Sequence, residues 1–228
     1  MKLINFPSLV TQKLRVTFLI IVIIICTFVF INVFSESLRL NTAPPKTKAN
    51  LKVSIKGEKT NSIKYSSYSS LLLSSFRGNL ASGIAVLFKA VSVSDSILSA
   101  GFTTIIYNLG DSPDAFTNPI IDSSNPNFNN YVNDAISNDD LTYDSYETDA
   151  RDENVTVAVT AFGSASEIRA KRLNFFQNAL SALNSKDYSG VATEYFICSK
   201  CGNIYTLSNV PGVCDICGMS KIRFITIK

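Results

Sequence analysis

Four cysteines near the C-terminus have the spacing of a metal site. Cys198 and Cys201 form one CxxC motif, Cys214 and Cys217 form a second, and residues 202–213 separate the two. Each motif can turn tightly around one ion, so the four thiolates supply a tetrahedral, all-sulfur donor set. Such soft donors select iron or zinc, and the spacing does not distinguish the two metals. A pair of disulfides is the alternative interpretation of the same residues.

A glycine directly follows each motif, Gly202 after the first and Gly218 after the second. The backbone has to fold back over the sulfur at these positions, and glycine adopts the positive φ that such a turn requires. The two half-sites therefore have matching local sequences, which favours a metal site over two disulfides.

The residues around these cysteines resemble the rubredoxin-like C-terminal domain of rubrerythrins. The similar stretches are Tyr195-Phe-Ile-Cys-Ser-Lys-Cys-Gly-Asn-Ile-Tyr205 and Pro211-Gly-Val-Cys-Asp-Ile-Cys-Gly-Met-Ser-Lys-Ile-Arg-Phe224. In that family this domain holds a single iron and passes electrons. The resemblance implies one iron bound by the four cysteines, with zinc as the alternative, and a redox partner that the sequence does not identify.

The composition excludes several classes of site. The chain contains no histidine, which rules out Ser–His–Asp triads, HExxH zinc sites and di-metal centres with imidazole ligands. Its formal net charge of +3 is too small and too evenly spread to indicate nucleic-acid binding. The 228 residues leave room for one domain of about 130 to 150 residues beside the cysteine module.

The N-terminal part of the chain is apolar enough to enter a membrane. Val16 to Phe34 contains no ionisable group except the Cys26 thiol, and as a helix it would span a hydrocarbon core of about 30 Å. We expect residues 1–35 to form a single-pass anchor with the folded domain on the extracytoplasmic side; a cleaved signal peptide is the alternative. Residues 36–60, with Pro44, Pro45 and several lysines, are expected to form a linker.

Four amphipathic segments follow, in residues 61–190. They cover residues 61–80, 80–109, 131–151 and 153–183, and a polar loop at 111–130 is long enough to be a crossover. This order fits a ferritin-like four-helix bundle. The predicted fold class is therefore mainly α: an N-terminal transmembrane helix, the bundle, and a small rubredoxin-like metal-binding domain at 191–228.

The second and fourth predicted helices also resemble those of rubrerythrins. In Ile84-Ala-Val-Leu-Phe-Lys-Ala-Val-Ser-Val-Ser-Asp-Ser-Ile-Leu98 and Phe162-Gly-Ser-Ala-Ser-Glu-Ile-Arg-Ala-Lys-Arg-Leu173, the family's Glu-x-x-His ligands would fall on the positions that are here Asp95, Leu98, Arg169 and Arg172. These residues leave too few donors for two irons, and guanidinium groups repel a cation. Rubrerythrin-type peroxidase activity is not expected, and no catalytic residue is predicted.

Two arrangements of these positions are open. Asp95 and one arginine can form a buried ion pair that cross-links the helices in place of the metal, or the arginines can lie at the rim with their charged ends in water. Two functions are also open: a one-electron carrier on a helical scaffold, or a structural or assembly protein with a zinc staple. The resemblance further implies a homodimer, for which the residues themselves give no self-association face.

Overall fold

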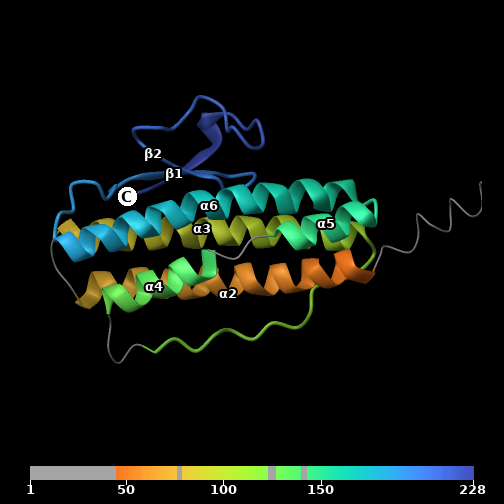
Figure 1. Ribbon diagram of the computed structural model, residues 1–228, viewed down its shortest axis with the longest axis horizontal. Coiled ribbons are helices and arrows are strands. Elements are labelled where there is room, and N and C mark those ends of the chain that lie inside the picture. Colours follow the sequence, from red (N-terminus) through yellow and green to blue (C-terminus); the bar gives the residue numbers. More distant parts are fainter. Residues whose placement is uncertain (1–44, 76–78, 123–126, 140–142) are drawn as a thin grey trace, which may run out of the picture. The chain divides into compact units, whose positions relative to one another are not determined.

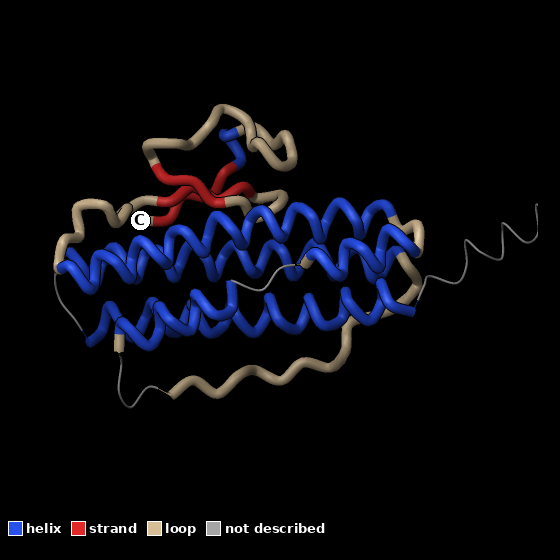
Figure 2. The backbone as a smooth tube through the Cα atoms, in the orientation of Figure 1, coloured by secondary structure: helices blue, strands red, loops and turns tan. Residues whose placement is uncertain are grey.

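The helical part of the chain consists of two antiparallel layers. The computed structural model describes residues 45–75, 79–122, 127–139 and 143–228. Helix α2 (Pro45–Ser75) packs along α3 (Asn79–Asn108), while α4 (Phe128–Asp139) and α5 (Asp144–Asp152) follow one another along α6 (Thr156–Ser185) (Figure 1). The polar crossover after α3 runs outside α2, on the side away from the sheet (Figure 2). The predicted bundle with its long central connection is confirmed.

The linker predicted at residues 36–60 is wrong from residue 45 onward. Helix α2 begins at Pro45, because proline is well tolerated in the first turn of a helix, where its missing N–H has no intrahelical partner. Its buried stripe includes Leu51, Ile55 and Glu58 at helical steps, but also several hydroxyl and amide side chains. Because this buried stripe has low hydrophobicity, the sequence pattern did not predict the helix. Residues 1–44, including the predicted anchor, lie outside the described part; residues 44–228 form one compact unit.

The third predicted helix, 131–151, is also wrong in part, because two helices occupy that stretch. Helix α4 ends at Asp139 and α5 begins at Asp144. Immediately before α5, the backbone N–H of Tyr143 donates to the Ser166 hydroxyl of α6, 3.0 Å away. This contact places the Tyr143 side chain inside the bundle, where it is 4 % exposed.

Two apolar clusters fill the bundle on either side of its centre. One contains Tyr65, Phe88 and Phe176, and the other contains Phe102 and Phe162. Among the described residues, the segment 82–108 of α3 is long and apolar enough to cross a membrane, but 72 % of its apolar 18-residue stretch is buried inside the protein. It is therefore the central core helix of the bundle.

A small antiparallel sheet lies over α3 and α6. Strand β1 (Tyr195–Cys198) is central, flanked by β2 (Ile204–Thr206) and by β3 (Phe224–Ile227), which follows the 3₁₀ turn η1 (Lys221–Arg223). The inward side chains of the sheet, Tyr195, Ile197 and Ile204, belong to the same apolar cluster as the bundle residues around Phe88. The cysteine module and the bundle thus share a hydrophobic core.

Candidate functional site

The four cysteines lie together, as their spacing predicted. The two tight turns are closed by Gly202 N–H to the Cys198 carbonyl and by Gly218 N–H to the Cys214 carbonyl, both at 2.9 Å. Gly202 has φ +81° and Gly218 has φ +73°, the left-handed conformation that glycine allows. Strand β1 ends at Cys198, so the first turn is fixed to the sheet.

The sulfur positions fit a tetrahedral ion. All four sulfurs lie within 4.8 Å of one another; Cys198 and Cys217 are 3.4 Å apart, and Cys201 and Cys214 are 3.6 Å apart. A tetrahedron with metal–sulfur bonds of about 2.3 Å has sulfur–sulfur edges of about 3.8 Å, whereas a disulfide needs about 2.05 Å. The cysteines are free thiols in a metal-binding arrangement, and the disulfide alternative is wrong.

A polar network surrounds the Cys214 sulfur. The Tyr205 hydroxyl lies within donating distance of two acceptors, this sulfur at 3.3 Å and the Asp215 carboxylate, and its single proton is shared between them. The Asn203 amide donates to the Tyr205 oxygen and to Asp215, at 2.7 Å each. Burial raises the pKa of the Cys214 thiol, but the hydrogen bonds from Tyr205 and from nearby backbone N–H groups outweigh it and lower the pKa to about 6. The thiolate is therefore favoured near neutral pH at Cys214, whereas burial raises the pKa of Cys198 to about 11 and also raises that of Cys201.

The bundle centre is a buried cluster of charges (the charge cluster: Glu58, Asp95, Asp139, Arg169 and Arg172). One guanidinium nitrogen of Arg172 lies 2.5 Å from Asp95, and the other lies 2.5 Å from Asp139. All three side chains are essentially inaccessible to solvent. Of the two arrangements left open by the sequence, the structure has the buried one, in which Arg172 contacts Asp95 inside the bundle rather than lying at the rim.

Arg169 completes the charge cluster from the same face of α6. Its guanidinium lies 2.7 Å from Glu58 and stacks over the Tyr143 ring, 4.7 Å from the ring centroid. The Tyr143 hydroxyl donates to the same Glu58 carboxylate, and the remaining Arg169 nitrogen donates to the Asn138 carbonyl. Leu98, the fourth position predicted from the resemblance, is 7 % exposed and belongs to the apolar cluster around Phe102.

The charge cluster holds three carboxyl groups and two guanidinium groups, so full ionisation would leave one excess negative charge. Burial raises the pKa of Asp95 well above its usual range against the opposing charge of Arg172, and it raises the pKa of Asp139 too. Burial acts likewise on Glu58, but Arg169 and Arg172 outweigh it and lower the Glu58 pKa to about 2. The Asp95 Oδ2 and Glu58 Oε2 atoms are both buried without a hydrogen-bond partner, so a proton taken up on Asp95 would balance the charge and supply a donor between the two carboxyl groups.

Sequence reasoning missed two members of the charge cluster, Glu58 and Asp139, and also Tyr143, which contacts it. Glu58 follows Leu51 and Ile55 at helical steps, which was a usable signal once α2 was recognised. Asp139 and Tyr143 lie in the stretch where the expected helix divides. Both residues contact side chains of α6, so no pattern in the neighbouring sequence predicted their place in the bundle centre.

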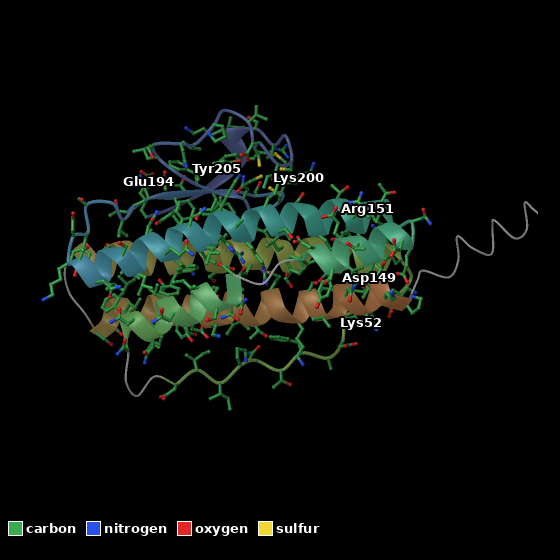
Figure 3. All side chains as sticks on the ribbon, in the orientation of Figure 1. Lys52, Asp149, Arg151, Glu194, Lys200 and Tyr205 are labelled. Carbon is green, nitrogen blue, oxygen red and sulfur yellow. The ribbon has the colours of Figure 1, made fainter. Side chains whose placement is uncertain are left out.

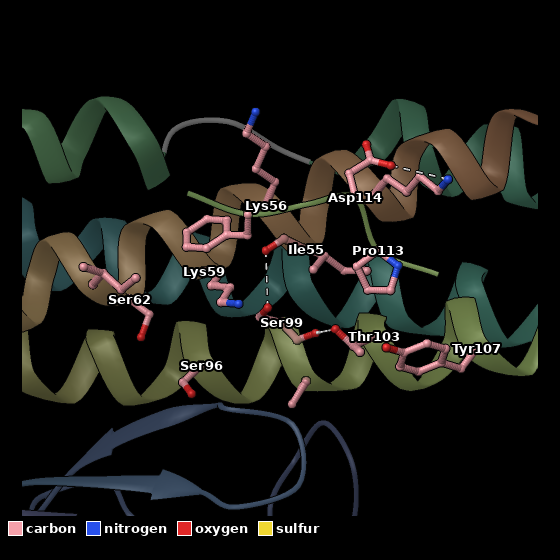
Figure 4. Close-up of a pocket in the computed structure, with 14 residues that line it drawn as sticks. Ile55, Lys56, Lys59, Ser62, Ser96, Ser99, Thr103, Tyr107, Pro113 and Asp114 are labelled. Atoms are coloured by element: carbon pink, nitrogen blue, oxygen red, sulfur yellow. Dashed lines mark hydrogen bonds and ion pairs between the residues drawn. The ribbon is translucent and has the colours of Figure 1, made fainter. Parts of the chain in front are cut away.

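A groove of about 760 Å³ lies between α2, α3 and the crossover (Figure 4). Lys52 pairs with Asp111 at 3.3 Å and with Asp114 at 3.5 Å. Lys59 lies over the Phe116 ring, 4.5 Å from its centroid. Both lysines of α2 contact side chains of the crossover, so the residues of this groove attach the crossover to the bundle.

Comparison with known proteins supports the fold. No protein-family model matches the chain. No curated protein matches it either. Solved structures of nigerythrin, in the fully reduced all-ferrous, partially reduced and mixed-valent states, match with TM-scores of 0.65, 0.65 and 0.64. Each is 20 % identical in sequence, and each match covers 81 % of this chain and 88 % of the nigerythrin chain.

Nigerythrin belongs to the rubrerythrin family. This chain shares its architecture, a ferritin-like helical bundle followed by a rubredoxin-like module in which four cysteines lie together. The resemblance predicted from the sequence is therefore confirmed at the level of the fold.

Proposed function

We propose that this protein is a membrane-anchored one-electron carrier that binds one iron through Cys198, Cys201, Cys214 and Cys217. The main support for this proposal is that the four cysteine sulfurs lie within 4.8 Å of one another. Iron in such a set exchanges one electron without changing its ligands. The nigerythrin structures with the same fold are described as ferrous and mixed-valent, which supports iron over zinc.

The protein's own residues prepare the site for this role. The knuckle turns hold the sulfurs in place, and hydrogen bonds from Tyr205 and the backbone direct positive charge toward the Cys214 thiolate. Hydrogen bonds to sulfur stabilise its negative charge and tune the potential of a bound metal. Asp215 and Asn203 orient the Tyr205 hydroxyl, since both contact its oxygen.

In this proposal the bundle is a scaffold without a di-iron centre. Its three buried carboxyl groups, the group type that binds di-iron centres in such bundles, are instead paired with Arg169 and Arg172. Each guanidinium already supplies the positive charge that an ion would bring, and it repels a second cation. Peroxidase chemistry of the rubrerythrin type is therefore not part of the proposed function.

The proposed anchor is Val16 to Phe34, whose composition suits a hydrocarbon core. The bundle would then face the extracytoplasmic side. Ten residues, 35–44, separate this segment from the start of α2.

Metal analysis and the visible spectrum of protein purified without added metal test the iron assignment. We expect one iron per chain and a strong visible absorption that bleaches on reduction, because ferric tetrathiolate is coloured. A colourless protein with one zinc per chain would instead support the structural-staple alternative, in which the metal only stabilises the module. Two further irons bound tightly in the bundle would overturn the scaffold assignment.

A further inference from the structure

An apolar groove of about 580 Å³ adjoins the four-cysteine centre. Its two walls are α3 and α6, and its end is formed by the first and second cysteine turns of the module. The lining residues used below are Leu98, Gly101, Phe102, Ala161, Cys201 and Cys217. The volume is in the range of small-molecule sites, and the lining is mostly apolar, as such sites usually are.

Polar groups are few and lie at defined places along this groove. Lys200 contributes a cation beside the cysteine turns, and Thr156, Thr160 and Ser164 contribute hydroxyl groups from α6. Figure 3 shows Lys200 close to the sulfur atoms of the module. The Thr160 hydroxyl donates to the Thr156 carbonyl of its own helix. The groove therefore suits a ligand with apolar faces and a small number of hydrogen-bond acceptors.

We propose that this groove binds the ring of a quinone, an inference that rests on the proposed electron-carrying function. A quinone ring has two apolar faces for Leu98, Phe102 and the helix walls, and carbonyl oxygens for a cation or a hydroxyl donor. A ring held here lies against Cys201 and Cys217, two of the four sulfur donors. A binding position next to the metal site suits a ligand that is itself redox-active.

The proposed membrane anchor favours a membrane quinone over other redox-active ring compounds. Quinones with apolar tails dissolve in the bilayer, and a protein anchored through residues 16–34 is held at the same membrane.

The groove offers a matched pair of substitutions. Gly101 lies in the lining, and a Cβ at this position meets no atom within 4 Å, so a leucine would extend into open groove space. Gly57, on α2, has the same open surroundings and does not line the groove. Leucine is favoured over glycine in a helix by about 1 kcal/mol, so both variants should fold.

The test uses the full-length, zinc-loaded protein in lipid nanodiscs, because zinc removes electron transfer from the readout. A tail-free dimethoxy-methyl-benzoquinone is titrated in, and an azido derivative of it locates the site by photolabelling and mass spectrometry, with empty nanodiscs as the blank. We expect saturable binding, labelling of peptides containing residues 97–105 or 156–164, and a loss of affinity of about tenfold or more in Gly101→Leu. Gly57→Leu should bind as the wild type does, and melting curves of both variants verify folding.

Several results would overturn the proposal: no saturable binding, labelling elsewhere, equal binding by Gly101→Leu, or displacement of the ring by a saturated fatty acid at equal concentration. The last result would show a groove for an acyl chain. If the full-length protein does not bind the ring but a protein without residues 1–44 does, the N-terminal segment occupies the groove. Because binding is measured with zinc, failure here is distinguishable from failure of the iron assignment, which the metal analysis decides independently.

Discussion

The Ser94 hydroxyl of α3 donates to the Gly202 carbonyl of the first cysteine turn, 2.7 Å away. The backbones of the two residues also lie close together: a Cβ added at Gly202 would lie 2.9 Å from the Ser94 carbonyl oxygen. Ser94 also lies 3.4 Å from a guanidinium nitrogen of Arg172. One serine thus connects the cysteine module to the charge cluster of the bundle, and the absence of a side chain at position 202 makes that contact possible.

Gly202→Ala should loosen the module from the bundle, and Gly218→Ala is its control. Both residues have positive φ, so each alanine costs about 1 to 2 kcal/mol of backbone strain. Gly218 has no neighbour within 4 Å of an added Cβ, whereas at Gly202 the added atom meets a backbone oxygen. Hydrogen exchange should therefore increase across β1 and the facing part of α3 in Gly202→Ala alone. Equal exchange in the two variants would contradict this account.

Asp95→Asn and Asp95→Ala should differ strongly in stability. Asparagine reproduces a protonated aspartate, since its carbonyl accepts from Arg172 and its amide can donate to Glu58; we expect a loss of about 1 kcal/mol or less. Alanine removes the oxygen that accepts from Arg172 and leaves this buried charged donor without its partner, so we expect a loss of about 3 to 5 kcal/mol. Urea unfolding of both variants measures the difference. Equal losses would mean that Asp95 is ionised in the folded protein.

Acid should weaken the bundle through Glu58. Its pKa is about 2 in the folded protein against 4.5 ordinarily. A lowered pKa gives stability that is present above pH 4.5 and is lost as the pH falls toward 2. The unfolding free energy of the wild type should drop more steeply over this window than that of Glu58→Gln. Glu167→Gln, at an exposed position of α6, is the control and should keep the wild-type slope; identical slopes for all three proteins would contradict the prediction.

Cys198→Ser and Cys214→Ser should each release the metal and unfold the module. A segment this short buries too little apolar surface to remain folded without a staple. Metal content by mass spectrometry should fall from one ion per chain to nearly none, and proteolysis should cut within the module. Cys26→Ser, which changes the cysteine outside the module, should keep its metal. Retention of the ion by both module variants would show that other residues bind it.

Two truncations separate anchoring from folding. Full-length protein should sediment with membranes, and a chain of residues 44–228 should be soluble and folded, since it contains the whole compact unit. A chain beginning at Ala49 lacks Thr47, whose N–H and hydroxyl both bind Glu153. It should lose about 1 to 3 kcal/mol because these bonds disappear. Thermal unfolding compares the two, and equal melting temperatures would show that the first turn of α2 contributes little.

The sequence alone determined the features that are local or strongly periodic. Two CxxC turns with their glycines assemble from adjacent residues, so spacing sufficed to predict that Cys198, Cys201, Cys214 and Cys217 meet. Helix α3 is apolar over most of its length, and its bounds were predicted to within about one residue. Helix α6 has a regular stripe of buried residues and was also recognised.

Only the tertiary structure decided the composition of the bundle centre. Glu58 and Arg169 are 111 positions apart, and each is tolerated inside the protein because the other neutralises it. A lone glutamate in a lysine-rich stretch gives no sign of burial, so the sequence indicated a linker where α2 begins. A charged side chain can be buried only where an oppositely charged partner lies next to it. Packing of distant segments of the chain determines which partner that is, so the neighbouring sequence does not reveal it.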